Sequence, residues 1–156
     1  MEVYDEKGSP IVYRHILVGL SQSNTAHRAL RRAIELASYL DASLTAVAVV
    51  PALPPQAAYA VGLGSDALRT LKGDEQSFFI ELLELAQREA AQHAIRIETA
   101  LSEGPVVVSL IEAVQKNQVD LLVLGIHHDK GLLEWLYGNT THELAQRAIC
   151  DILGVH

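Results

Sequence analysis

Short, continuous apolar runs alternate along the chain with longer segments in which apolar residues recur every three or four positions. The runs at 15–20, 42–50 and 119–124 are typical of strands that are buried on both faces. Residues 95–101 alternate apolar and polar side chains, which predicts a strand with one solvated face near a sheet edge. A last apolar run, CDILGV at 150–155, predicts a terminal strand.

Amphipathic helices separate these strands. The first follows a polar stretch at 21–24 that offers several N-cap residues, and its apolar positions recur at three- and four-residue spacing. The second is predicted from Gly73 to about Ala94. Its apolar side is expected to consist of Phe78, Ile80, Leu82, Leu83, Leu85 and Ala86. The third covers 106–117, with Pro105 suited to its first position, and the fourth covers about 139–148.

Strands that alternate with helices in this way require right-handed crossovers and a mainly parallel sheet. The sequence therefore predicts an α/β domain of three layers, with helices on both faces of a doubly wound, five-stranded sheet. This domain is expected over residues 12–156, after a flexible N-terminal arm at 1–11. A proline- and alanine-rich loop at 51–65 is unusually long, and such loops are either functional or simply mobile.

The architecture indicates where a ligand would bind. In open α/β sheets, ligands lie beyond the carboxyl ends of the strands, where the strand order reverses. If the first and fourth strands flank that point, the site is lined by 19–24, by the chain from Val49 onward and by 125–141. Gly125 ends a strand and Gly138 leads into a helix, where backbone N–H groups without a helical partner can hold an anion. These glycines frame a candidate phosphate site.

Charge and composition narrow the classes of partner. The net charge of −7 and pI near 5.4 argue against nucleic acid, which proteins hold mainly through Lys and Arg. A single cysteine, Cys150, rules out an internal disulfide and a multi-cysteine metal cluster. The N-terminal residues do not form a secretory signal, and the apolar runs are too short to span a membrane. The expected location is therefore the cytoplasm.

Three segments resemble the universal stress protein (UspA domain) family: YRHILVGL with the alanine-rich helix that follows it, VDLLVLG, and GNTTHELAQRAICDILGV. They are similar to the opening strand and helix, the fourth strand, and the closing helix and strand of that family. The resemblance covers about residues 12–155 in the same order. It implies the adenine-nucleotide alpha-hydrolase-like fold and a small cytoplasmic stress-response protein, commonly a homodimer. Some members bind ATP or AMP, and others do not.

Nucleotide-binding members carry the signature Gly-x-x-Gly-(nine residues)-Gly-Ser/Thr after the fourth strand. Gly125 and Gly138 match its first and last glycines at the correct separation. His128 stands in place of the middle glycine, and Asn139 in place of the hydroxyl residue. Ser21 replaces the acidic residue that usually ends the first strand. The GIHHD sequence resembles the subgroup that does not hold nucleotide, whereas GNTT resembles the subgroup that does.

These departures from the nucleotide-binding pattern of the family have physical consequences. An imidazole at position 128 would crowd a phosphate that approaches the backbone, although a protonated histidine could pair with it. The Asn139 amide can still donate a hydrogen bond, but Ser21 lacks the carboxylate expected beside a ribose or a metal. The resemblance implies a site made of Ser21, Val49, Gly125, His127, Gly138, Asn139, Thr140 and Thr141. It implies that the amides of 138–141 hold phosphates, Val49 contacts the base and Ser21 lies near the ribose. The implied ligand is ATP or AMP, with Mg²⁺ possible beside ATP, or none if the altered motif is inactive.

Other residues of the last third have simpler interpretations beside their functional ones. Neighbouring residues such as His127, His128 and Asp129 seldom converge on one ion, so no metal site is expected. The segment LLEWLY at 132–137 is either a lid or partner surface, or a small helix that packs on the domain's own core. Cys150 is expected to be a buried apolar residue.

The function classes follow from these observations. The sequence contains no G-x-S-x-G elbow, no full Walker A motif and no H-E-x-x-H, and no nucleophile has an evident base. We therefore expect a stress-associated binding or signalling module and no catalytic residue. The alternatives are a protein-interaction module with a closed site and, more distantly, a slow nucleotide hydrolase. The terminal strand is expected at a sheet edge, where a second copy could pair with it as a homodimer.

Overall fold

Five parallel strands form a single sheet in the order β3-β2-β1-β4-β5. The computed structural model describes residues 8, 10, 12–52, 65–126 and 140–156. The strands are β1 His15–Leu20, β2 Ser43–Pro51, β3 Ile97–Gly104, β4 Leu121–Gly125 and β5 Asp151–Val155. The helices are α1 Asn24–Leu40, α3 Ser65–Gln92, α4 Val106–Lys116 and α6 Thr140–Arg147. The predicted doubly wound α/β fold is confirmed.

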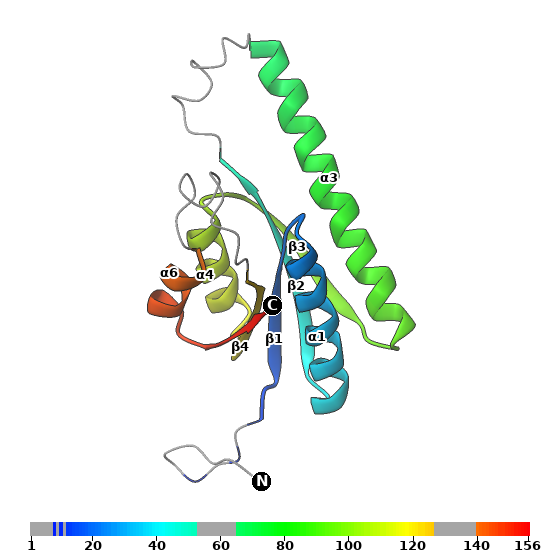
Figure 1. Ribbon diagram of the computed structural model, residues 1–156, viewed down its shortest axis with the longest axis vertical. Helices are drawn as coiled ribbons and strands as arrows, with labels where there is room; N and C mark the ends of the chain where they lie inside the picture. Colours follow the sequence, from blue (N-terminus) through cyan, green and yellow to red (C-terminus); the bar gives the residue numbers. More distant parts are fainter. Residues whose placement is uncertain (1–7, 9, 11, 53–64, 127–139) are drawn as a thin grey trace.

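Helices cover both faces of the sheet (Figure 1). Residues of α1 and α3 pack on one face in a cluster with Ile16, Val18 and Leu44. On the other face, α4 and α6 pack against Leu17, Val47 and other apolar residues. Strands β1, β2 and β4 are buried on both faces because each contributes side chains to both clusters, as their continuous apolar runs predicted.

Helix α1 begins and ends at residues that are suited to capping a helix. The Ser23 side chain accepts a hydrogen bond from the backbone N–H of Ala26 and caps the first turn. At the other end, Asp41 adopts a left-handed conformation with φ 53°, and its N–H donates to the Ala37 carbonyl. Among the four polar residues that could have capped this helix, Ser23 is the one that does so.

Helix α3 differs from its prediction in two respects. It begins at Ser65, eight residues before the predicted Gly73. A glycine inside a helix costs about 1 kcal/mol relative to alanine, but the helix-forming residues on both sides of Gly73 outweigh that cost. The predicted apolar side is also wrong in part, because Phe78, Ile80 and Leu85 are exposed. Among the α3 side chains that the structure describes, the buried ones are Phe79, Leu83, Ala86 and Ala90.

The ends of several other elements also move. Strand β3 continues to Gly104, through most of the predicted turn at 102–105, because β2 pairs with it up to Pro51. Pro105 is the N-cap of α4 instead of its first helical residue. The strand predicted at 119–124 runs from Leu121 to Gly125. As predicted, β3 and β5 are the edge strands.

Several predicted features fall outside the described residues. These are most of the arm at 1–11, most of the loop at 51–65, the candidate ligands 127–129 and the LLEWLY segment at 132–137. Among the described residues, no helix combines the length and apolar character needed to cross a bilayer.

Candidate functional site at the carboxyl edge of the sheet

Strand β1 lies between β2 and β4, so the strand order reverses there. Chain connections leave β1 toward β2 and β3 on one side, whereas β4 and β5 occupy the other. The sequence predicted that the first and fourth strands would flank this point, and the parallel pairing of β1 with β4 confirms it. The geometry therefore provides the kind of crevice in which α/β proteins bind ligands.

Ser21 and Val49 occupy neighbouring positions at this edge. In the register of β1 and β2, Leu20 pairs with Ala48, and Ser21 and Val49 are the next residues along the two chains. Val49 is 6% exposed and packs in the cluster on the α4 face. Ser21 is exposed and stands just beyond the end of β1. The two residues thus stand near the carboxyl ends of two central strands, with Val49 buried on the α4 face and Ser21 exposed.

A chain of hydroxyl groups links Ser21 to the start of α1. The Oγ atoms of Ser21 and Ser23 are 3.0 Å apart, and the Ser23 Oγ lies 3.1 Å from Thr25 Oγ1. Ser23 Oγ also accepts from the Ala26 N–H at 3.0 Å, so the N-cap bond orients this chain. From the sequence, Ser23 was predicted only as a possible cap and Thr25 was not predicted at all. Their alternation with Ser21 was the signal that could have revealed them.

Gly125 packs directly against the first turn of α1. A Cβ atom at this position would lie 2.7 Å from the Thr25 carbonyl oxygen and still closer to Thr25 C and Ala26 N. Contacts this short do not occur for real Cβ atoms, so only glycine permits this approach of β4 to α1. Gly125 therefore brings the end of β4 against the first turn of α1, a packing role that was not predicted from the sequence.

The other candidate residues belong to the segment after β4 and to α6. Thr140 and Thr141 form the first turn of α6 and are partly buried. Leu144, one turn later, is fully buried in the same cluster as Val49 and Leu124. This contact places α6 on the face of the sheet where Val49 lies. The remaining candidates, His127, Gly138 and Asn139, lie outside the described residues.

Comparison with known proteins decides the family. The model of the universal stress protein family matches residues 12–156, which is nearly the whole chain. The chain belongs to the universal stress protein family. A universal stress protein of Methanocaldococcus jannaschii is 27% identical over 144 residues, which cover 92% of this chain and 82% of that protein. One from Coxiella burnetii is 26% identical over 146 residues, covering 92% and 96% of the two chains.

Solved structures of universal stress proteins share the fold. The UspA structure from Lactobacillus plantarum superimposes with a TM-score of 0.76 at 25% identity, covering 94% of this chain and 99% of that one. A universal stress protein of Archaeoglobus fulgidus gives a TM-score of 0.59 at 16% identity, with 94% and 100% of the two chains covered. The five-stranded parallel sheet described above is therefore the fold of this family.

Two hollows lie near the carboxyl edge, on the face covered by α1 and α3. One, of about 210 Å³, includes Ser21 and lies between the start of α1 and the α3 residues Phe78 and Leu82. The other, of about 340 Å³, lies between α3 and the ends of β2 and β3, and Val50 and Arg69 are among its lining residues. Neither hollow is lined by Val49 or Gly125. Val49 packs against α4 and α6 and therefore lies on the face of the sheet opposite these hollows.

Ionisable groups at the other edge of the sheet serve to hold the strands together. The Tyr13 hydroxyl donates to Asp151 Oδ2 at 2.8 Å, and this bond, with burial and the charges of Asp151 and Asp120, raises the pKa of Tyr13 to about 12. The carboxylate of Asp120 accepts from the backbone N–H groups of Arg14 and His15 at 2.9 and 3.1 Å. These bonds tie the starts of β1, β4 and β5 together, far along the strands from the candidate site.

The described residues contain no group of three or more His, Cys, Asp or Glu side chains arranged to hold a metal ion. Cys150 is half-buried, and burial raises the pKa of its thiol. A raised pKa disfavours the reactive thiolate, in keeping with the apolar role expected for this residue.

Proposed function

We propose that this protein is a stress-response binding or signalling module with an altered adenine-nucleotide site at the carboxyl edge of its sheet. The observation that carries this proposal is that Ser21, Val49 and Gly125 stand at or near the carboxyl ends of β1, β2 and β4, where the strand order reverses. Val49 offers an apolar side chain for a base, Ser21 offers a hydroxyl for a sugar, and Gly125 lets the end of β4 approach the start of α1 with no side chain between them.

The ligands of two relatives support an adenine nucleotide. One universal stress protein structure, 23% identical with a TM-score of 0.70, is a complex with cAMP. The Archaeoglobus fulgidus structure is a complex with dAMP. Both ligands carry an adenine base and one phosphate. We therefore propose AMP or ATP as the ligand class, with Mg²⁺ as a possible companion of ATP, in a cytoplasmic protein.

Each residue has a proposed role. Val49 contacts the base, and Ser21, oriented through Ser23, offers a neutral hydroxyl to the ribose. The backbone N–H groups of 138–141 hold the phosphates at the start of α6, with His127 beside them. A neutral hydroxyl binds a ribose more weakly than a carboxylate, since hydrogen bonds to charged groups are about twice as strong. Weak binding is therefore part of the proposal.

Calorimetric titration with AMP and with ATP, with and without Mg²⁺, tests the proposal. We expect saturable heat and a thermal shift at micromolar to millimolar ligand. Replacing His128→Gly should strengthen binding because it restores the bare backbone of the family signature. The matched control is His93→Gly, which makes the same change at an exposed turn after α3. No heat and no thermal shift at millimolar nucleotide would show that the site is closed to these ligands.

Binding without turnover is the proposed activity. Incubation with ATP should release phosphate no faster than a protein-free blank. Steady release that disappears on substitution of Gly138 would instead establish a slow hydrolase.

A homodimer through β5 is the proposed assembly. This strand is an edge of the sheet, and Ile152, Leu153 and Val155 are only partly buried along it. Ile149, just before the strand, is 76% exposed. Unpaired edge strands with apolar side chains invite pairing with a second copy. Light scattering should give the mass of a dimer, and Ile149→Asp should shift it toward the monomer. An unchanged mass in this variant would place the contact elsewhere.

A further inference from the structure

The residue just beyond the end of β1 is Ser21, and its hydroxyl differs from a carboxylate in what it can offer a ligand. An ionised carboxylate only accepts hydrogen bonds, whereas a hydroxyl has one O–H donor and two acceptor lone pairs. Aspartate and glutamate are absent from residues 12–34, which include all of β1 and the first turns of α1. The start of α1 therefore offers hydroxyl and amide groups with no carboxylate among them.

The bonds around Ser21 allow its hydroxyl to serve a ligand either as a donor or as an acceptor. Ser21 Oγ accepts from the Ser23 backbone N–H at 3.4 Å and lies 3.0 Å from Ser23 Oγ. If Ser23 donates its hydroxyl hydrogen to Ser21, both lone pairs of Ser21 are occupied and its own O–H is directed away from Ser23. In the reverse arrangement, Ser21 donates to Ser23 and keeps a lone pair for a ligand hydroxyl. A carboxylate at this position could only accept.

Ser21 also lines the hollow of about 210 Å³ between α1 and α3. One ordered water needs only about 10–15 Å³, so this hollow has room for a phosphate group. The buried part of its lining is apolar, whereas four consecutive residues before and at the start of α1 carry hydroxyl or amide groups. They are Ser21, Gln22, Ser23 and Asn24. These side chains supply O–H and N–H donors from which the oxygens of a phosphate can accept.

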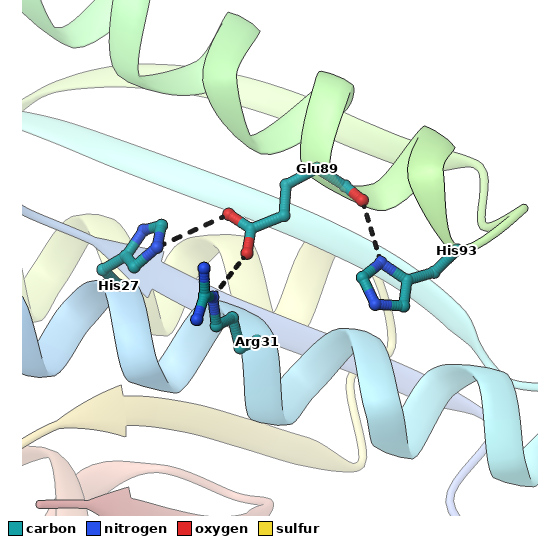
Figure 2. A network of polar contacts seen from close by, with 4 residues as sticks. All are labelled: His27, Arg31, Glu89 and His93. Atoms are coloured by element: carbon teal, nitrogen blue, oxygen red, sulfur yellow. Dashed lines mark hydrogen bonds and ion pairs between the residues drawn. The ribbon is translucent and has the colours of Figure 1, made fainter.

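The charged side chains beside this hollow are paired with one another. His27 lines the hollow, and Figure 2 shows His27 and Arg31 of α1 directed at Glu89 of α3. Arg31 Nε donates to Glu89 Oε1 at 2.8 Å, and His27 Nε2 lies 3.7 Å from Glu89 Oε2. The charge of Glu89 is thus compensated by Arg31 and does not oppose an anion in the hollow. Direct contacts to such an anion fall to the neutral donors of residues 21–24.

We propose that the site accepts an adenine nucleotide with a phosphate ester on a ribose hydroxyl, at the 2′- or 3′-oxygen, and that Ser21 determines this specificity. The inference rests on the proposed function, which puts Ser21 beside the ribose. A carboxylate there would repel the added phosphate, whereas the Ser21 hydroxyl donates to it and the hollow receives it. In dinucleotide-binding α/β folds, a carboxylate likewise selects a free ribose hydroxyl, and a different residue is needed where that hydroxyl is phosphorylated.

Calorimetric titration of the full chain with three nucleotides tests the proposal. The nucleotides are AMP, adenosine 2′,5′-bisphosphate and adenosine 3′,5′-bisphosphate. Each bisphosphate keeps the 5′-phosphate of AMP and differs from it only in the added ester, and the comparison of the two shows which oxygen carries it. We expect at least one bisphosphate to bind as tightly as AMP or more tightly. If both bind more than about tenfold more weakly than AMP, the proposal is wrong.

Ser21→Asp tests the role of the hydroxyl directly. Aspartate still accepts from the Ser23 N–H, so the start of α1 should be kept, which circular dichroism checks. The new charge opposes the added phosphate, and we expect bisphosphate affinity to fall by at least about tenfold relative to AMP affinity. Ser38→Asp makes the same change of charge at an exposed position later in α1 and should leave the ratio of the two affinities unchanged. An equal effect of Ser21→Asp on AMP and on the bisphosphates would overturn the assignment.

Ser21→Ala separates hydrogen-bond donation from charge. It removes the donor without adding a carboxylate, so bisphosphate affinity should fall severalfold relative to AMP affinity, because hydrogen bonds to a charged group are the stronger ones. A ratio that Ser21→Ala leaves unchanged would show that Ser21 does not donate to the phosphate and would refute its role.

The result for AMP keeps this inference apart from the proposed function. If AMP binds and Ser21→Asp does not change the ratio of affinities, the inference is wrong and the proposed nucleotide site stands. If none of the three nucleotides binds at millimolar concentration, both are wrong.

Discussion

Replacing Gly125→Ala is the most direct test of how the candidate site is assembled. The added Cβ would lie 2.7 Å from the Thr25 carbonyl oxygen and overlap the backbone of the first turn of α1. Since the obstructing atoms are backbone, no side-chain rotation can relieve the overlap, and β4 and α1 must separate. Overpacking of this kind costs about 1–3 kcal/mol in the free energy of unfolding. For a chain of this size, that loss lowers the melting temperature by roughly 2–4 °C per kcal/mol.

The chain offers a control of opposite sign. Gly73 lies inside α3, and a Cβ there would have no heavy atom within 4 Å. Gly73→Ala should therefore stabilise the protein by about 0.5–1 kcal/mol through helix propensity alone. Urea unfolding followed by circular dichroism measures both changes. If Gly125→Ala unfolds within about 0.5 kcal/mol of the original protein, the experimental error of such comparisons, the close approach of β4 to α1 is wrong.

Two further predictions concern the hydrogen bonds that Ser23 makes at the start of α1 and that Tyr13 makes just before β1. Ser23→Ala should lower the free energy of unfolding by about 1 kcal/mol and speed hydrogen exchange of the first amides of α1. Ser38 is exposed within the same helix, so Ser38→Ala should change neither the free energy of unfolding nor the exchange rates. Tyr13→Phe removes the hydrogen bond to Asp151 and should lower the free energy of unfolding at pH 7 by about 1 kcal/mol. This is less than a fully buried bond to a carboxylate would contribute, because solvent screens the pair. The folded pKa of about 12 lies above the ordinary 10.0, so the contribution of Tyr13 is full below pH 10 and is lost as the pH rises toward 12. A stability difference between Tyr13→Phe and the original protein that persists unchanged at pH 12 would contradict this assignment.

Much of the fold could be predicted from the sequence, because the apolar runs and periodicities that indicate buried strands and helices are local properties of the chain. The apolar runs at β1, β2 and β4 identified central strands, and the alternation at 95–101 identified an edge. Strand and helix alternation then required the parallel sheet. Where the sequence failed, a neighbouring element decided the outcome. Pairing with β2 extended β3 to Gly104, and the packing of α3 selected Phe79 over Phe78 as the buried phenylalanine.

The features of the candidate site also divide into those that the sequence determined and those that only the tertiary structure decided. The sequence by itself determined the two framing glycines with their spacing and the loss of the acidic residue at Ser21, because these are facts of composition and order. Only the tertiary structure decided that Leu20 pairs with Ala48, just before Ser21 and Val49, and that Gly125 must be glycine for its contact with α1. Strand register and interatomic approach arise between segments distant in the chain. No local pattern records them, and the packing of β4 against α1 had to be seen in three dimensions.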